Sequence, residues 1–455
     1  MTRVVVVGGG IAGLAAAHRL HTLRPDLDVV VLDQRDRPGG KLATGDLAGG
    51  PVERGAESFL MGDPAGGPSA AVRLAEEVGL GPAIVHPTPA RAAVALDGGL
   101  RDLPAGTLMG IPLQAADSAP DEPAPAPLLP PGGDVTVGGL VRARRGDAVV
   151  DHYVEPLLGG VYAGRADRLS LRMALPALAA AAERTHTLTD ALAEAVGASQ
   201  RTPGAPVFGT IQGGMGRLVG AVAAALPDVR SGVTVRALHR HGAGWRLTLG
   251  STRDAETLDA DGVVLAVPAA PAARLLASVE GARAVPLEYA SVALVALALP
   301  DTALPELSGF LVPATEGYAV KAVTFFDRKW AHLRRPGVTV LRASIGRHGD
   351  EARLQHPDED LVQVVRAEVA KLLGMGALPA EIDRAVFRWG GALPQYEPGH
   401  RDRVATLRAG LAAHPAIAVA GAAYDGVGIP VCIASGRAAA DTVLGWAGTT
   451  PGLEQ

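Results

Sequence analysis

The chain has 455 residues, of which 48% are hydrophobic and 20% charged, and this composition predicts a folded globular protein of two or three domains. Its net charge of −5 leaves no basic surplus to neutralise phosphates, so no nucleic-acid partner is expected. A single cysteine, Cys432, excludes an internal disulfide framework and fits a reducing compartment. No secretory leader or apolar run of about 18 residues is visible, so we expect a cytoplasmic protein, with peripheral membrane contact left open.

The N-terminal residues predict a strand, a helix and a second strand. Residues 3–7 are apolar and β-branched, 11–23 are small and helix-like, and 28–33 are again apolar. Asp33 ends the second strand, where an acid accepts ribose hydroxyls in dinucleotide-binding proteins. This order and spacing predict a βαβ unit that binds a dinucleotide.

The turn between the first strand and the helix carries the pattern Gly8-x-Gly10-x-x-Gly13. Gly8 permits a tight turn, and Gly10 lets the backbone approach a pyrophosphate. Gly13 allows close packing of the helix on the strand, while the helix N-terminus offers the positive end of its dipole.

Two further stretches of small residues follow the acid. "RDRPGGKLAT" (35–44) contains a glycine pair beside Lys41, and "VERGAESFL" (52–60) contains Gly55, Ala56, Glu57 and Ser58. Adjacent glycines let a chain pass close to a ligand, and a cation suits phosphate. An ordinary turn would also explain the glycine pair. Since a plain NAD-binding domain does not need these contacts, the stretches favour FAD.

Further along, the sequence alternates between strand-like and helix-like segments. Asp97-Gly98-Gly99 marks the turn of a hairpin, and residues 119–133 are proline-dense and predict a surface loop. The other expected elements are a helix at 69–80, helices over 134–200, a hairpin at 232–250, a strand at 260–268, mixed structure over 270–400, a strand at 416–426, and a helix from about Cys432.

No metal site is predicted. Two histidine pairs, His18/His21 and His239/His241, have spacings that could suggest metal binding, but no acidic or thiolate partners accompany them. We therefore expect surface histidines.

Several longer blocks carry a resemblance to a known family. They are "RRGDAVVDHYVEPLLGGVYAGRADRLSLRMALPAL" (144–178), "IQGGMGRLVGAV" (211–222), "KAVTFFDRKW" (321–330), "VLRASIGRHGD" (340–350), "WGGALPQYEPGH" (389–400) and "YDGVGIPVCIASG" (424–436). With them, the chain resembles the FAD-dependent coproporphyrinogen III oxidase / protoporphyrinogen oxidase family, the Gram-positive-type branch of the flavin amine oxidase superfamily.

The resemblance implies an α/β fold with an FAD-binding Rossmann-like (GR2-type) domain, an interleaved α+β substrate domain and a helical domain. The implied boundaries are 1–75, 205–270 and 405–455 for the FAD-binding domain, 76–104 and 271–404 for the substrate domain, and 105–204 for the helical domain.

The resemblance also implies which residues contact FAD. Val235 would contact the adenine side through its backbone, Trp389 would lie near the cofactor, and residues 427–429 would close on the flavin. The full set is Gly8, Gly9, Gly10, Ile11, Ala12, Gly13, Asp33, Gln34, Gly40, Lys41, Gly55, Ala56, Glu57, Ser58, Val235, Trp389, Val427, Gly428 and Ile429.

On the substrate side, the segment around Gly160 would line the cavity, with Arg165 and Lys321 as candidate contacts to substrate carboxylates. Other cations near family-like motifs are Arg168, Lys329 and Arg347. The sequence departs from the family pattern at Asp33, where relatives more often have Glu, and at Asp63, near which relatives often place a cation.

The implied reaction converts a porphyrinogen to a porphyrin in heme biosynthesis by removing six electrons and six protons. Hydride would pass from a methylene bridge of the substrate to flavin N5, with O2 as acceptor and H2O2 released, so no side chain is predicted as catalytic. Coproporphyrinogen III is the expected substrate; protoporphyrinogen IX, a flavin amine oxidase, and a porphyrin-binding flavoprotein without turnover are the alternatives. The other expected partners are a membrane surface or another enzyme of the heme pathway.

Overall fold

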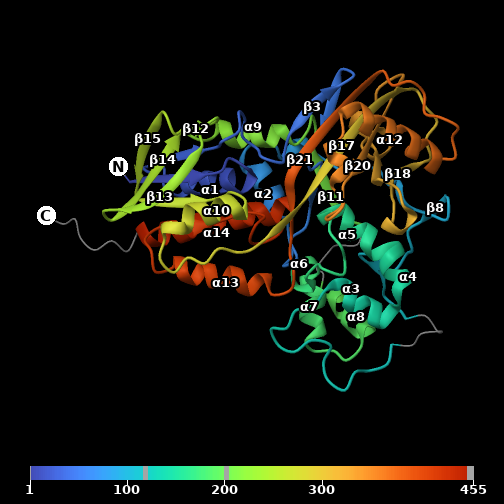
Figure 1. Ribbon diagram of the computed structural model, residues 1–455, viewed down its shortest axis with the longest axis horizontal. Helices are drawn as coiled ribbons and strands as arrows, with labels where there is room; N and C mark the ends of the chain where they lie inside the picture. Colours follow the sequence, from blue (N-terminus) through green and yellow to red (C-terminus); the bar gives the residue numbers. More distant parts are fainter. Residues whose placement is uncertain (1, 116–120, 199–203, 448–455) are drawn as a thin grey trace.

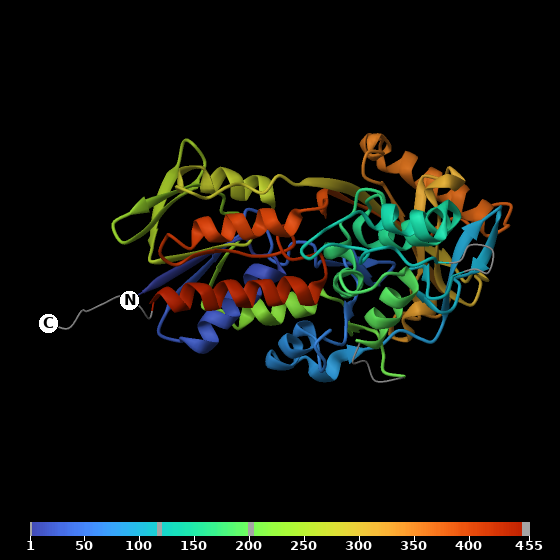
Figure 2. The same cartoon turned by 90° about the horizontal axis from the view of Figure 1, so that it is seen from below.

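A computed structural model describes residues 2–115, 121–198 and 204–447 of the protein. Figure 1 shows two sheet-based parts side by side, with a mainly helical part below the right-hand one. Figure 2, turned by 90°, shows the same elongated arrangement, with β1 beginning and α14 ending toward one end of the molecule.

The first part is built on a five-stranded parallel sheet. The strand order is β12 (Asp228–Arg230), β2 (Asp28–Leu32), β1 (Arg3–Val7), β16 (Gly262–Leu265) and β22 (Ile417–Val419). Helices cover both faces, so the strands are continuous apolar runs rather than alternating ones. Segments from the beginning, the middle and the end of the chain thus share one sheet.

Alternate residues of each strand enter different cores. Val4 and Val6 pack with α1 (Ile11–Leu23), α2 (Ala70–Glu77), α9 (Gly216–Ala224) and α14 (Ile429–Ala447). Val5 and Val7 pack on the opposite face with α10 (Ala269–Leu275), α13 (His400–Leu411) and the antiparallel sheet β13 (Val235–His241), β14 (Gly244–Gly250) and β15 (Ala255–Ala260).

The second part is a seven-stranded sheet covered by α12 (Asp358–Leu372). Its order is β21 (Asp383–Gln395), β17 (Glu288–Pro300), β20 (Val338–Ile345), β19 (Val320–Phe325), β18 (Leu307–Leu311), β7 (Arg91–Leu96) and β8 (Gly99–Asp102). Neighbouring strands are antiparallel except β18 and β7. The two longest strands, β17 and β21, run from this sheet toward the parallel-sheet part (Figure 1).

The helical part encloses its own apolar core. Its helices are α3 (Val137–Arg145), α4 (Asp147–Val149), the π-helical turn η2 (Val150–Val154), α5 (Glu155–Tyr162), α6 (Leu171–Ala174), α7 (Pro176–Ala182) and α8 (Leu188–Gly197). Tyr162 and Tyr396 meet edge to face in this core, with ring centroids 6.0 Å apart, and so join the helical part to the segment after β21.

Short elements complete the chain. They are β3 (Thr44–Leu47), β4 (Gly50–Glu53), β5 (Phe59–Leu60), β6 (Ile84–Val85), β9 (Thr107–Leu108), β10 (Ile111–Pro112), β11 (Phe208–Ile211), α11 (Phe326–Lys329), and the 3-10 turns η1 (Gly81–Ala83), η3 (Leu276–Ser278), η4 (Ala314–Glu316), η5 (Ala331–Leu333) and η6 (Ala352–Gln355).

The expected fold class is confirmed, since the α/β architecture contains the Rossmann-like parallel sheet. The N-terminal strand, helix and strand match the predicted ranges within a residue, and the predicted hairpin turns at Asp97-Gly98 as expected. Both turn residues have positive φ (51° and 76°), as a tight two-residue hairpin turn requires.

Two expectations need correction, and a third is confirmed with one addition. The proline-dense stretch is a loop of mostly exposed residues, as predicted; residues 119 and 120 lie outside the described residues, and within 121–133 the Leu129 side chain is only 1% exposed. Its neighbour Leu128 donates a backbone hydrogen bond to the Thr185 carbonyl, so the stretch packs on the helical part. The last helix begins at Ile429, earlier than Cys432. His18 is buried rather than on the surface, because α1 is covered by α2 and α14.

Among the described residues, no helix combines the length and the apolar character that crossing a bilayer requires.

Candidate cofactor and substrate site

The glycine loop and the glycine pair lie against one another. The Gly39 N–H donates to the Gly9 carbonyl at 2.7 Å, and Gly10 and Gly39 form an isolated parallel bridge. A Cβ on Gly13 would lie 1.9 Å from the Gly8 carbonyl oxygen, so only glycine permits this packing of helix on strand. A Cβ on Gly10 would meet nothing within 4 Å, and α1 has no side-chain N-cap. The helix N-terminus therefore faces open space where an anion fits.

Asp33 stands at the end of β2 beside this loop. Its Oδ2 accepts the Gly9 N–H and its Oδ1 the Arg35 N–H, both at 2.8 Å. The Asp33 backbone also pairs with the segment before β13, since its carbonyl accepts the Val233 N–H at 2.8 Å. This brings half-buried Val235 toward the same edge, whereas the Gln34 side chain is exposed. Each Asp33 oxygen retains a lone pair, so the carboxylate can also accept a hydroxyl hydrogen bond.

Lys41, next to the glycine pair, carries a half-buried cation. No described group forms a hydrogen bond or ion pair with its ammonium. Burial lowers the pKa of Lys41; the neighbouring Cys432 opposes this shift, and Arg35 adds to it. Burial also raises the pKa of the Cys432 thiol to about 11, so Cys432 is a packed thiol. A half-buried ammonium without an acceptor among the described residues suits a ligand oxygen.

The last loop, residues 420–428, comes to the same place from the other end of the chain. The Ser435 hydroxyl accepts the Gly421 N–H at 2.8 Å and donates to Asp425 at 2.5 Å, which fixes the loop on α14. A Cβ on Gly436 would lie 2.0 Å from the Ala12 carbonyl oxygen, so α1 and α14 cross in direct backbone contact. The N-termini of the two helices, at Ile11 and Ile429, are thereby held together by one crossing.

Trp389, on β21 of the second sheet, contacts the segment that follows β4. Its indole N–H donates to the Arg54 carbonyl at 2.5 Å, and the Arg35 guanidinium lies 5.3 Å from the ring centroid. A Cβ on Gly55 would lie 2.0 Å from the Lys41 carbonyl oxygen and 3.3 Å from the Trp389 ring. Glycine is therefore required where segment 53–58 passes between the glycine pair and this tryptophan.

Glu57 is the exception among the predicted cofactor contacts, because its side chain faces the second sheet. It is 9% exposed and ion-paired with Lys329 and with Arg342, the latter at 2.6 Å. Burial would raise the pKa of Glu57, but the two cations outweigh it and hold the pKa below its usual value. Arg342 also donates to the backbone carbonyls of Glu53 and Gly55 at 2.8 and 3.0 Å.

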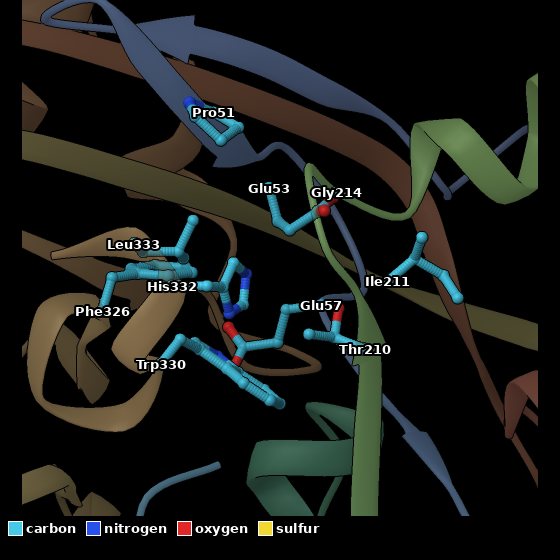
Figure 3. Close-up of a pocket in the computed structure, with 10 residues that line it drawn as sticks. All are labelled: Pro51, Glu53, Glu57, Thr210, Ile211, Gly214, Phe326, Trp330, His332 and Leu333. Atoms are coloured by element: carbon cyan, nitrogen blue, oxygen red, sulfur yellow. The ribbon is translucent and has the colours of Figure 1, made fainter. Parts of the chain in front are cut away.

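A small pocket lies behind this segment (Figure 3). Its ten lining residues come mainly from β4, β11 and the stretch from α11 to η5. Glu53, one of them, accepts the Met215 N–H at 2.6 Å and the Thr44 hydroxyl at 3.1 Å, and burial raises the pKa of the Glu53 carboxyl to about 7. Glu53 and Arg342 were not predicted as part of the site. The "VERG" and "VLRAS" motifs contain them, but a sequence does not say which charges meet.

His400 is a second buried polar residue that the sequence reading did not single out. It is fully buried and stacks on Tyr396 with ring centroids 4.9 Å apart. Neither ring nitrogen has a hydrogen-bond partner among the described residues, and burial lowers the His400 pKa to about 4. The His400 ring is therefore neutral, and the backbone of Ala423 and Tyr424, within the last loop, lies near it.

On the substrate side, four of the five predicted cations are tied to other groups. Arg165 pairs with Glu155 at 2.9 Å, and Arg347 donates to the carbonyls of Val312 and Tyr318 at 2.9 and 3.1 Å. The other two, Arg168 and Lys329, are ion-paired with glutamates. Lys321 differs, since it forms no ion pair with a described residue and donates only to the Gly159 carbonyl, at 3.1 Å.

The gathered residues fit a flavin dinucleotide. A glycine-only loop at an open helix N-terminus suits a pyrophosphate, an acid at the end of β2 suits a ribose, and unpartnered Lys41 suits an anionic oxygen. Two strand–loop–helix units converge, so one long ligand can bridge them. No group of three or more His, Cys, Asp or Glu side chains within the described ranges is arranged to hold a metal ion.

Comparison with known proteins agrees with this geometry. The family model described as flavin containing amine oxidoreductase matches residues 11–444. A coproporphyrinogen III oxidase of Mycobacterium tuberculosis is 39% identical over 96% of this chain and 96% of its own length. A coproporphyrinogen III oxidase of Bacillus subtilis is 31% identical, with 97% of each chain covered. A crystal structure of a protein from Exiguobacterium sp. 255-15 matches with a TM-score of 0.83 at 30% identity, covering 97% of this chain and 98% of that one.

Proposed function

The chain belongs to the family of flavin-containing amine oxidoreductases, and from that premise we propose that it oxidises coproporphyrinogen III to coproporphyrin III with FAD. The observation that carries the proposal is the match to the Mycobacterium tuberculosis coproporphyrinogen III oxidase, which is 39% identical and extends over nearly all of both chains. A match of that extent includes the substrate-side elements as well as the cofactor-binding ones.

The cofactor is proposed to lie along the first glycine loop, the glycine pair and the last loop. The loop from Gly8 to Gly13 would hold its pyrophosphate, Asp33 its ribose, and Lys41 an oxygen of the phosphate or of the flavin. Residues 427–429 and Trp389 would enclose the flavin end. Glu57 would act through its backbone, since its carboxylate is ion-paired on the far side.

The FAD-binding part is proposed to comprise residues 1–75, 205–270 and the C-terminal segment, the substrate part 76–104 and the second sheet, and the helical part 105–204. The boundary expected at 404/405 falls inside helix α13, whose Val404, Leu407 and Leu411 share a core with β22. We therefore place the start of the C-terminal segment at His400.

When bound, FAD supplies the two-electron acceptor for each oxidation of a methylene bridge. The residues of the chain bind, orient and exclude water, and none of them is assigned as a general base. The unpartnered ammonium of Lys41 would favour negative charge on whichever cofactor oxygen it meets. Because six electrons leave each porphyrinogen in pairs, O2 as acceptor would give three H2O2 per porphyrin.

The proposal is tested by following porphyrin fluorescence and peroxide with the purified, flavin-loaded protein. Coproporphyrinogen III should be oxidised with about three H2O2 released per porphyrin formed, and with a higher kcat/KM than protoporphyrinogen IX. Putrescine, an amine of the kind that other members of the superfamily oxidise, should give no peroxide. Turnover of protoporphyrinogen IX alone, or of amines alone, would contradict the proposal.

A further inference from the structure

Lys321 occupies an irregular position in the second sheet. The register between β19 and β20 shifts between Val320 and Ala322, which places Lys321 at a β-bulge. Val320 and Val323 enter the core beneath α12, whereas the Lys321 ammonium reaches the Gly159 carbonyl on α5. A bulge re-aims a side chain that regular alternation would place elsewhere, and bulges of this kind are frequent beside binding sites.

The ammonium is buried without a counterion. Lys321 is 6% exposed, and one carbonyl accepts only one of its three N–H groups. No carboxylate among the described residues lies within ion-pair distance, and the nearest charged group to influence it is another cation, Arg347. Burial and that neighbour lower the pKa of Lys321 to about 7. Arg347 has fewer N–H groups free to donate to an added anion, since two of its nitrogens are bonded to backbone carbonyls.

Two glycines of α5 lie beside the lysine. The Gly159-Gly160 pair belongs to α5, and this helix packs against β18, β19 and β21, next to Lys321. A Cβ on Gly159 would lie 3.9 Å from the Gly164 carbonyl oxygen and one on Gly160 3.6 Å from the Leu311 side chain, so neither glycine is held in a tight contact. A carboxylate arriving along the glycine pair would provide the missing counterion.

We propose that the Lys321 ammonium binds a carboxylate of the porphyrin substrate and is a specificity residue for its propionate groups. This inference rests on the proposed function. A lysine is suited to the role because, unlike arginine, it can be neutral in the empty protein and become protonated when an anion arrives. The carboxylate then forms a charge-assisted hydrogen bond shielded from water.

The test compares a charged and an uncharged form of the same porphyrin. Coproporphyrin III and its tetramethyl ester are titrated into flavin-loaded wild-type protein, Lys321→Met, Lys321→Gln and the control Lys371→Met. Lys371 lies exposed on α12 and stacks on Tyr318, so its substitution leaves the site intact. Flavin content and melting temperature are measured for each variant, and Lys321→Met should melt no lower than wild type because it removes a buried charge.

Both Lys321 variants should bind coproporphyrin III about 10- to 100-fold more weakly and bind the ester as wild type does. For coproporphyrinogen III, KM should rise while kcat changes little. Equal affinity of wild type for acid and ester, or equal loss of both in the variants, would overturn the inference. Wild-type turnover reports separately on the proposed function: failure of wild type to oxidise coproporphyrinogen III counts against that function, whereas the acid–ester difference counts only for or against Lys321.

Discussion

Glu53 is a single buried carboxyl whose surroundings set its pKa. It lies next to Glu57 and Arg342, with its carboxylate held by the Met215 N–H and the Thr44 hydroxyl. Because the folded-state pKa is about 7 and the ordinary value 4.5, the folded protein holds the proton more tightly than the unfolded chain. The free energy of unfolding therefore falls as pH rises above about 4.5, because Glu53 must ionise in the folded protein, and this loss of stability is complete above about 7.

We predict that Glu53→Gln stabilises the protein at about pH 8 but not at about pH 5. The pKa shift of Glu53 corresponds to a gain of about 3 kcal/mol in the free energy of unfolding of the variant at high pH. The glutamine carbonyl can still accept the Met215 N–H. Melting temperatures of wild type and variant across this range measure the effect. The exposed Glu280→Gln serves as control and should show no such trend. A difference between Glu53→Gln and wild type that shrinks as pH rises would refute the assignment.

For single residues, the sequence predicted the roles of glycines better than the partners of charged side chains. Gly8, Gly10 and Gly13 were assigned roles that follow from backbone geometry alone, and Gly13 has the close approach that its role requires. Charged residues behaved differently. Arg165 and Lys321 could not be distinguished in the sequence, yet only one of them has a carboxylate partner. Partner choice depends on contacts between distant segments, and local pattern does not contain that information.

Among the elements, the crossing of α1 and α14 positions the N-terminal ends of both helices, which are proposed to meet the cofactor. Gly436 of α14 meets the Ala12 carbonyl of α1 so closely that a methyl group cannot fit. Any side chain there must push the helices apart and displace both the first glycine loop and the last loop. The second glycine-rich loop at the C-terminus is thus part of the same site as the first one.

We predict that Gly436→Ala lowers both stability and flavin retention. Overpacking of this kind costs about 1–3 kcal/mol, and the displaced helix ends should weaken flavin binding. Gly220→Ala in α9 is a matched control: the position is exposed, and an added Cβ would meet nothing within 4 Å. That control should keep its flavin and gain up to about 1 kcal/mol from improved helix propensity. Urea unfolding and the flavin-to-protein ratio measure both effects, and a Gly436→Ala protein with full flavin content would contradict the prediction.

The elements themselves were largely predictable where their pattern is regular. Apolar β-branched runs predicted β1 and β2, and alternation around Asp97-Gly98-Gly99 predicted the β7–β8 hairpin. The surface loop predicted from the high proline content of 121–133 is present, but the burial of Leu129 within it was not predicted. The segment has no helix or strand but buries Leu129 and bonds to the α7–α8 turn, because proline prevents regular structure without preventing burial.

On the scale of the whole molecule, three stretches of one chain build the parallel sheet and two build the second sheet. Such interleaving leaves no local signature in composition, and it was expected only through the family resemblance. As a consequence, β17 and β21 extend from the second sheet toward the proposed cofactor site, where Trp389 contacts segment 53–58. Substrate and cofactor elements therefore form one unit rather than two separate sites.

The central claim, that this site removes electrons from coproporphyrinogen III, is tested most directly without oxygen. Coproporphyrinogen III is added anaerobically to the flavin-loaded protein while the yellow flavin absorption is followed. We predict that the absorption is lost as coproporphyrin III fluorescence appears, and that it returns when air is admitted. A flavin that stays oxidised with coproporphyrinogen III, but is bleached by protoporphyrinogen IX or by an amine, would contradict the account.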